Sequence, residues 1–248
     1  MQAGGRFFFE LKNRYAMLLP QEAYHAIRVL RKKVGDKILL IDGRGKEFEG
    51  EIVEIDRKKR TPEVKVKILK TLREEIEERP IITALIPLLK KENTELIVEK
   101  GTELGVNKFI PFVSKHTVVK RDEKFVEKLK KKSMEALKQS GRLILPEIKE
   151  PISLENFLKN GLSGKLVVGT PEKKLKNVKE LIEAIANYKE VYLLTGPEGG
   201  FSREEEDLIE KLNPLKVSLG RYVLRAETAS IVLMGIFTFI RYNFKRNT

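Results

Sequence analysis

The pattern of apolar residues changes near residue 75, and this change constrains the fold more than any other feature of the sequence. Beyond it, apolar stretches of strand length alternate with segments of helical periodicity. Strands are predicted at 81–89, 108–113, 165–170, 191–196 and 216–220, and helices at 93–104, 124–140, 177–187, 202–212 and 229–244. Such alternation is typical of a parallel sheet covered by helices on both faces. Residues 73–248 are therefore predicted to form an α/β domain.

Residues 1–72 follow a different pattern. They contain short strand-like stretches at 6–11, 37–42, 47–55 and 63–69, separated by turns rich in glycine, aspartate and proline. One segment, 21–33, has helical spacing of its apolar residues. The sequence predicts a small, β-rich, barrel-like domain.

Residue usage excludes several classes of protein. The chain contains no cysteine, which excludes disulfides and thiolate metal sites. Its two histidines, His25 and His116, are far apart in the sequence, so no metal site is expected. His25 is predicted to pack or to contact RNA rather than to act as an acid or base. The chain lacks a signal-peptide pattern and an apolar run that could span a bilayer, so a cytoplasmic protein without membrane contact is expected.

The net charge of +13 is spread along the chain. Residues 1–74 hold 18 Lys and Arg against 11 Asp and Glu, and the rest holds 31 against 25. A polyanionic partner, nucleic acid above all, would explain this excess. A lysine-rich surface of a thermophilic protein is the alternative. The basic edge of the first domain, with Arg6, Arg28, Arg31 and residues 57–60, is the predicted contact.

Three predicted strands end in glycine or proline turns, in the stretches 167–174, 193–201 and 218–229. The most informative part is TGPEGGFSREEED (195–207), which overlaps the second of these stretches. Its three glycines allow close approach of the backbone to a ligand. Pro197 stiffens the turn, and Ser202 with Glu205 predicts a capping box for the next helix. A plain strand-to-helix connection is the alternative, although it would need fewer glycines. Ligands bind at the carboxyl ends of strands in open α/β sheets, so this loop is predicted to line a site.

The residues of this loop restrict the ligand. The loop lacks the Lys-Ser/Thr end of a P-loop and the spacing of a dinucleotide fingerprint. Glu198 would repel phosphate, but it can accept hydrogen bonds from hydroxyls or attract a cation. S-adenosylmethionine (SAM) has ribose hydroxyls, a sulfonium and no phosphate, and so it meets these requirements without being the only ligand that does.

The stretch LGRYVLRAETA (219–229) follows the last predicted strand. It offers a strong cation, Arg225, beside Glu227. Thr228 is predicted to be the N-cap of the apolar helix that follows. A local ion pair between Arg225 and Glu227 is the alternative to a functional role. The helix 229–244 has hardly a polar face and is expected to be buried in its own core or against a partner.

These two stretches resemble the paired signature of the RsmE family, the 16S ribosomal RNA (uridine N3)-methyltransferases of the SPOUT superfamily. Three further blocks resemble the family in the same order, at 25–45, 99–112 and 135–148. The resemblance therefore covers nearly the whole chain. One segment departs from it, because the family commonly has an acidic-arginine-serine stretch where this chain has SKHTVVKRDEK (114–124).

The resemblance implies a PUA-like β-barrel domain at 1–72 and a trefoil-knotted SPOUT methyltransferase domain with a mostly parallel sheet at 73–248. It further implies SAM as cofactor, the small ribosomal subunit as partner, and a homodimer with its site near the subunit interface. Arg225 and Glu198 are the predicted catalytic residues. Whether Glu198 or Glu227 accepts the proton stays open. The residues predicted to bind RNA are Arg6, Arg28, Arg31 and Arg142. Those predicted to bind the cofactor are Gly169, Leu194, Thr195, Gly196, Glu198, Gly199, Gly200, Leu219, Gly220, Val223, Leu224, Ala226, Glu227, Thr228 and Ala229.

Two other functions stay open at this stage. One is a SPOUT methyltransferase that acts on another RNA. The other is a non-catalytic RNA-binding or ribosome-assembly factor that has kept the fold. Binding of SAM would separate the enzymes from the assembly factor.

Overall fold

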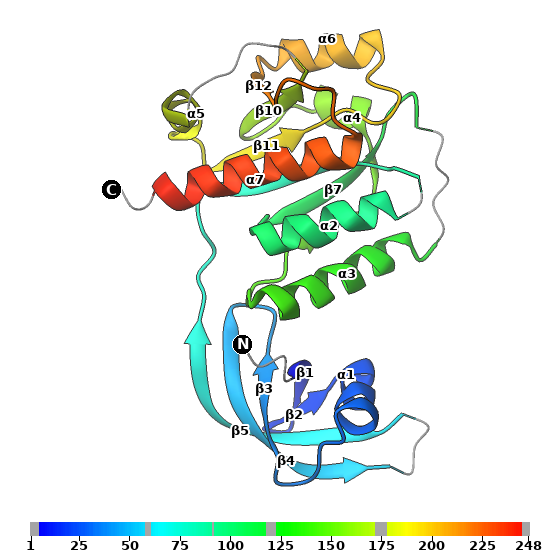
Figure 1. Cartoon of the computed structure of the whole chain (residues 1–248), viewed down its shortest axis with the longest axis vertical. Helices are drawn as coiled ribbons and strands as arrows, with labels where there is room; N and C mark the ends of the chain where they lie inside the picture. The colour runs from blue at the N-terminus through cyan, green and yellow to red at the C-terminus, as the bar shows by residue number, and fades with distance from the viewer. Residues whose placement is uncertain (1–4, 58–60, 91, 118–122, 172–177, 245–248) are drawn as a thin grey trace. The chain divides into compact units, whose positions relative to one another are not determined.

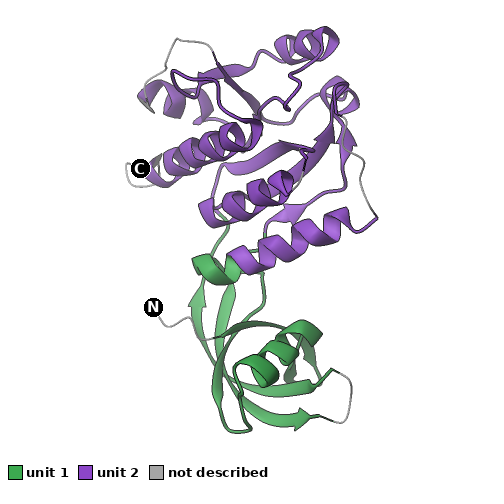
Figure 2. Ribbon diagram, turned by 45° about the vertical axis from the view of Figure 1, so that its right-hand side comes forward, with its two compact units in different colours: residues 1–77, 137–145 green, residues 78–136, 146–248 purple. Residues whose placement is uncertain are grey.

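The computed structural model describes residues 5–57, 61–90, 92–117, 123–171 and 178–244. The chain divides into two compact units (Figure 2). Unit 1 comprises Met1–Glu77 and Leu137–Leu145, and unit 2 comprises Glu78–Ala136 and Pro146–Thr248. The division after residue 77 lies slightly beyond the predicted boundary at 72. Residues 137–145, which the sequence placed in the second domain, group with the first.

Unit 1 is built on a closed barrel of five strands in the order β1-β2-β5-β4-β3. The strands are β1 (Arg6–Lys12), β2 (Tyr15–Leu18), β3 (Lys37–Ile41), β4 (Lys46–Asp56) and β5 (Glu63–Glu74). All neighbours pair antiparallel except β1 and β3, which are parallel. Alternate residues of the strands, among them Phe7, Leu40, Ile52 and Val66, are fully buried in the barrel core. The predicted barrel is confirmed, and β2 is the strand that sequence analysis missed.

The helical segment of unit 1 is shorter than predicted. It begins as α1 (Pro20–Tyr24) and continues as a π-helix, η1 (His25–Val29). The prediction extended it to residue 33, but Arg31 takes a left-handed conformation with φ of 55°. That conformation is incompatible with a continuing right-handed helix, so the segment ends before it.

A buried carboxylate lies at the centre of an ionic cluster in unit 1. Glu47 accepts hydrogen bonds from Arg6 Nε at 2.7 Å and from Arg73 Nε at 2.6 Å. Arg6 also donates from Nη1 to the Lys138 carbonyl at 3.1 Å. Burial acts to raise the pKa of Glu47, but Arg73 and Arg6 outweigh burial and hold the pKa below its ordinary value of 4.5. Arg6, predicted to bind RNA, is thus engaged within the unit.

Glu47→Gln is expected to lower the free energy of unfolding by about 2 kcal/mol near neutral pH, because it removes two charged hydrogen bonds. The folded-state pKa of Glu47 is lowered, so its contribution is present above the unfolded value and is lost as the pH falls through the folded value. The difference between wild type and variant should therefore shrink as the pH falls through the lowered pKa of Glu47. Urea denaturation at several pH values measures it. Glu10→Gln, at an exposed position of β1, is the control and should change little.

Unit 2 contains a parallel sheet in the order β12-β10-β11-β6-β7-β8, with β9 also paired to β7. The strands are β6 (Ile81–Pro87), β7 (Lys108–Val113), β8 (Glu147–Ile148), β9 (Ile152–Ser153), β10 (Lys165–Thr170), β11 (Glu190–Leu194) and β12 (Leu215–Ser218). Every strand pair in this sheet is parallel. The carboxyl ends of β12, β10, β11 and β6 consequently lie next to one another along one edge of the sheet.

Helices cover both faces of this sheet (Figure 1). They are α2 (Asn93–Leu104), α3 (Phe125–Ser140), α4 (Leu154–Lys159), α5 (Val178–Ile185), α6 (Arg203–Lys211) and α7 (Ala226–Phe244). Buried residues of α2, α3, α5 and α7 share one apolar cluster with the sheet. Those of α4 and α6 share a second cluster, which contains the alternate residues of the strands. The predicted α/β architecture is confirmed, whereas β8, β9 and α4 were not predicted. The trefoil knot stays a prediction of the resemblance.

The carboxyl-terminal half of α7 carries a buried cation. Arg241 donates from Nη1 to Asn107 Oδ1 at 2.6 Å and from Nη2 to the Gly105 carbonyl at 2.7 Å. Its Nε lies 3.4 Å from Glu78 Oε2. Gly105 ends α2 in a left-handed conformation with φ of 99°, as its glycine predicted. Arg241 therefore joins α7 to the end of α2 and to the start of β7.

None of the helices in the described residues is long and apolar enough to cross a membrane.

Candidate active site

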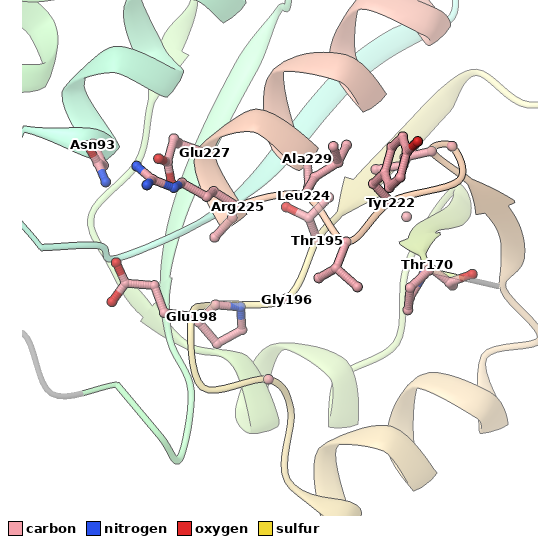
Figure 3. A pocket seen from close by; sticks show the side chains of 18 of the residues that line it. Asn93, Thr170, Thr195, Gly196, Glu198, Tyr222, Leu224, Arg225, Glu227 and Ala229 are labelled. Atoms are coloured by element: carbon pink, nitrogen blue, oxygen red, sulfur yellow. The ribbon is translucent and has the colours of Figure 1, made fainter.

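A cavity of about 660 Å³ opens at the carboxyl ends of β10, β11 and β12. The loops that follow these three strands line it, together with two residues that follow β6. The two glycine-containing stretches that sequence analysis singled out therefore face one space (Figure 3). The strands β10, β11 and β12 run parallel, so their carboxyl ends lie at the same edge of the sheet. The loops that follow them therefore meet at that edge.

The loop after β11 runs from Thr195 to Phe201. Its Gly200 N–H donates to the Pro197 carbonyl at 2.9 Å, which closes a turn with Glu198 and Gly199 at its centre. Gly200 has φ of 69°, a conformation that favours glycine. The predicted capping box is confirmed, since Ser202 and Glu205 exchange hydrogen bonds at the start of α6. The turn is thus held between a buried strand and a well-capped helix.

The loop after β12 leads directly into α7. The predicted N-cap of this helix, Thr228, is wrong, because α7 begins at Ala226. The Arg225 carbonyl accepts the hydrogen bond from Ala229 N–H at 2.8 Å, so Arg225 stands in the capping position. Thr228 is an exposed residue of the first turn. The Thr195 and Ser230 hydroxyls lie 2.6 Å apart and join the end of β11 to α7.

Most of the residues predicted to bind a cofactor line the cavity. They are Gly169, Thr195, Gly196, Glu198, Gly200, Leu219, Gly220, Val223, Leu224, Ala226, Glu227 and Ala229, and the predicted catalytic Arg225 lines it with them. Leu194, Gly199 and Thr228 do not. Leu194 is fully buried in the sheet core. Gly199 faces the other side of its turn, where an added Cβ would lie 3.1 Å from His116 Cβ.

Six lining residues were not predicted. They are Lys90, Asn93, Thr170, Pro171, Pro197 and Tyr222. Four of these, Thr170, Pro171, Pro197 and Tyr222, lie in the three strand-end stretches. They could have been predicted from the sequence, because each is close to a residue that was. Lys90 and Asn93 follow β6, and only the pairing of β6 with β11 brings them to the site. In the stretch 167–174, residues 172–174 lie outside the described part of the chain.

The cavity has a charged end and a less polar end (Figure 3). Asn93, Arg225, Glu227 and Glu198 lie at one end, and Tyr222 and Thr170 lie at the other. Within the described residues, no hydrogen bond or ion pair joins Arg225 to Glu227, so the alternative of a local ion pair is not what this structure contains. The charged end can therefore bind a polar group through hydrogen bonds and ion pairs. The described residues include no cluster of His, Asp or Glu that could hold a metal ion.

All four residues predicted to bind RNA belong to unit 1. Arg28 and Arg31 are exposed, on η1 and directly after it. Arg142 is half-buried, and Arg6 is bound to Glu47. Of the predicted basic edge at 57–60, residues 58–60 lie outside the described residues.

Comparison with known proteins matches both units to one kind of enzyme. A family model described as "RNA methyltransferase domain" matches residues 77–238, and one described as "RNA methyltransferase PUA domain" matches residues 20–60. The ribosomal RNA small subunit methyltransferase E of Rickettsia conorii is 29% identical over 84% of this chain and 82% of its own length. That of Bacillus subtilis is 26% identical over 94% of this chain and 96% of its own.

Among solved structures, a putative methyltransferase from Legionella pneumophila in complex with SAM superposes with a TM-score of 0.80. It is 28% identical, and the match covers 94% of this chain and 96% of that one. These findings confirm the resemblance that the sequence motifs carried. The methyltransferase model alone spans well over half of the residues, from Glu77 to residue 238 within α7. The chain belongs to the RNA methyltransferase family.

Proposed function

We propose that this chain transfers the methyl group of SAM to N3 of one uridine in 16S ribosomal RNA. The observation that carries the proposal is the cavity. Its glycine-containing loops face one space with two carboxylates and with Arg225, which has no ionic partner among the described residues. The names of the curated relatives supply the RNA, since they are ribosomal small-subunit methyltransferases. The related Legionella structure supplies the cofactor, because it holds SAM.

The residues of the cavity fit SAM. Its volume of about 660 Å³ lies within the range of small-molecule sites. Gly200 and Gly220 have φ of 69° and 134° and meet no other atom within 4 Å of an added Cβ, so their backbone borders open space. At Gly169 a side chain would collide with Leu219 Cδ1 at 2.9 Å. The loops after β10, β11 and β12 would hold the adenosine and methionine parts, and bound SAM would supply an activated methyl group.

The protein's own contribution would be largely one of position. Aligning the attacking nitrogen with the methyl carbon and sulfur can lower a barrier by roughly 7–11 kcal/mol in favourable cases. The uracil must also leave its stack or base pair, since N3 lies on the Watson–Crick edge, at a cost of a few kcal/mol. The charged end of the cavity, with Arg225 and Asn93, would receive that edge.

Deprotonation of N3 is the chemical difficulty. Negative charge spreads onto the two carbonyl oxygens of the base as the proton leaves, and Arg225 would stabilise this charge. Glu198 or Glu227 would accept the proton, and the other would hold hydroxyl groups of the cofactor. Both carboxylates line the cavity and both lack an ionic partner among the described residues.

Two measurements test the proposal. Calorimetric titration with SAM should show binding in the micromolar range, and the absence of binding would favour a non-catalytic assembly factor. Mass-spectrometric mapping of modified uridines in ribosomal RNA, with and without the protein, should then reveal one N3-methyluridine in the small-subunit RNA. Methylation of another RNA instead would support the remaining alternative.

Arg28 and Arg31 are proposed to contact RNA phosphates from unit 1. Each phosphate contact adds to the dependence of binding on salt, because neutralising a phosphate releases counterions. The double variant Arg28→Ala/Arg31→Ala should weaken RNA binding and reduce the slope of log K against log salt by roughly 1.5–2. Lys37→Ala is the control, since Lys37 is paired with Glu49 at 2.7 Å. An unchanged slope in the double variant would remove these residues from the interface.

A homodimer is also proposed, supported by apolar side chains that the described chain leaves uncovered. Phe239 and Tyr242 of α7 are 60% and 52% exposed, and Tyr222 and Val223 beside the cavity are more exposed still. Light scattering should give twice the chain mass. Phe239→Glu should give a monomer, because a buried carboxylate without a partner would oppose association. A cytoplasmic location is proposed as well, because the proposed substrate is ribosomal RNA.

A further inference from the structure

The segment that follows β7 contacts the turn that carries Glu198. His116 Nδ1 lies 3.2 Å from the Gly199 carbonyl oxygen, across 83 residues of sequence. A carbonyl only accepts, so His116 is the donor. The neighbouring Lys115 N–H donates to Glu205 Oε1 at 3.0 Å, and its ammonium group lies 3.2 Å from Glu204 Oε2. The segment 114–117 is therefore attached both to the turn and to the helix that follows it.

The turn itself has two sides. Glu198 faces the cavity, whereas Gly199 faces His116. The approach is close, because a Cβ on Gly199 would lie 3.1 Å from His116 Cβ. Among the described residues, the bond from His116 is the one hydrogen bond that joins turn residues 197–200 to a distant segment. Their other bond, from Gly200 N–H to the Pro197 carbonyl, lies within the turn.

We propose that His116 is a positioning residue that sets the orientation of Glu198 in the active site by holding the Gly199 carbonyl. The proposal rests on the proposed function, in which Glu198 contacts the substrate or the cofactor. It concerns the part of the sequence that departs from the family pattern, 114–124, of which residues 118–122 lie outside the described chain. Displacement of Gly199 away from the segment 114–117 would also displace the adjoining Glu198, and the hydrogen bond from His116 opposes that displacement.

The position of the donor atom Nδ1 in the side chain decides which substitutions can test the proposal. The Nδ1 of histidine is bonded to Cγ, as is the amide nitrogen of asparagine, whereas the amide nitrogen of glutamine lies one bond further along. His116→Asn should therefore keep the hydrogen bond, and His116→Gln and His116→Ala should lose it. Nδ1 can donate in neutral and in protonated histidine alike, so the contact does not depend on the charge of the ring.

The experiment measures the dissociation constant for SAM and the kcat for methylation of small-subunit RNA. It uses the wild type, His116→Ala, His116→Gln, His116→Asn, Glu198→Gln and the double variant His116→Ala/Glu198→Gln. Loss of His116 should change the same parameter that Glu198→Gln changes, by about three- to tenfold, as expected for one hydrogen bond. Asparagine should restore it. In the Glu198→Gln background, His116→Ala should have no further effect, because the residue that it positions has already been altered.

Lys115→Ala is the matched control. It removes the exposed pair with Glu204 and keeps the backbone bond to Glu205, so both parameters should stay at the wild-type value. His116 is exposed, and its variants should unfold at the wild-type temperature.

Three outcomes would overturn the proposal. Equal activity of His116→Ala and the wild type would show that the contact does not matter. Equal loss in His116→Asn and His116→Ala would exclude the Nδ1 hydrogen bond. Additive effects in the double variant would show that His116 acts independently of Glu198. Failure of the wild type to bind SAM is a separate result, and it would reject the proposed function instead.

Discussion

Arg225→Ala is expected to lower kcat for RNA methylation about 100- to 1,000-fold, the range found when one donor to a developing negative charge is removed. The affinity for SAM should stay within about twofold, because the proposed role of Arg225 arises only in the transition state. Arg225 is exposed, lines the cavity at its charged end and has no ionic partner among the described residues. Its guanidinium is therefore available to a carbonyl oxygen of the proposed uracil substrate.

Arg221→Ala is the matched control for this experiment. Arg221 is an exposed arginine of the same loop that does not line the cavity, so it should leave kcat unchanged. Arg225→Lys should recover only part of the rate, since an ammonium group is a strongly hydrated point charge whose donors are not held in a rigid plane. If Arg225→Ala methylated RNA at the wild-type rate, Arg225 would have no role in catalysis. It would then serve only as the capping residue at the start of α7.

Arg241→Ala is expected to lower the free energy of unfolding by about 3 kcal/mol, because it breaks a buried charged network. Only 5% of Arg241 is exposed, and its guanidinium satisfies the Gly105 carbonyl and the Asn107 side chain. Its loss would leave the carbonyl at the end of α2 without a donor and open a cavity beneath α7. Urea denaturation followed by circular dichroism measures the change.

Lys211→Ala, at the exposed end of α6, is the control and should change stability by less than about 0.5 kcal/mol. Arg241→Lys should show an intermediate loss, since a single ammonium group cannot reach both oxygens in the same geometry. A stability of Arg241→Ala equal to that of wild type would mean that α7 is held by its apolar contacts alone.

The architecture of both units could be predicted because their periodicity is regular. Strands of alternating or continuous apolar residues in the first 72 positions gave the barrel, and the strand–helix alternation gave the parallel sheet. The capping box at Ser202 and the helix end at Gly105 also followed from local rules. In each case the signal lies within a few residues of the feature that it determines.

The errors arise where distant residues decide the outcome. Lys90 and Asn93 reach the cavity only because β6 pairs with β11, a neighbour from the other end of the domain. Gly199 stays a predicted cofactor residue that does not line the cavity, and its nearest neighbour on the other side of the turn is His116. The start of α7 was misplaced because threonine is a good N-cap by composition, whereas the helix continues back to Ala226. Local propensity could not reveal any of these contacts.

Unit 1 takes nine of its residues, Leu137–Leu145, from beyond the first half of the chain. There Lys138 binds Glu22 at 2.7 Å, and Leu143 N–H binds Glu75 at 2.6 Å. The module that begins at the amino terminus is therefore incomplete until residue 145 has left the ribosome that makes it. An excised fragment that ends at residue 77 should accordingly be more susceptible to proteolysis than the same residues in the whole protein, and adding a synthetic peptide of residues 137–145 should protect it.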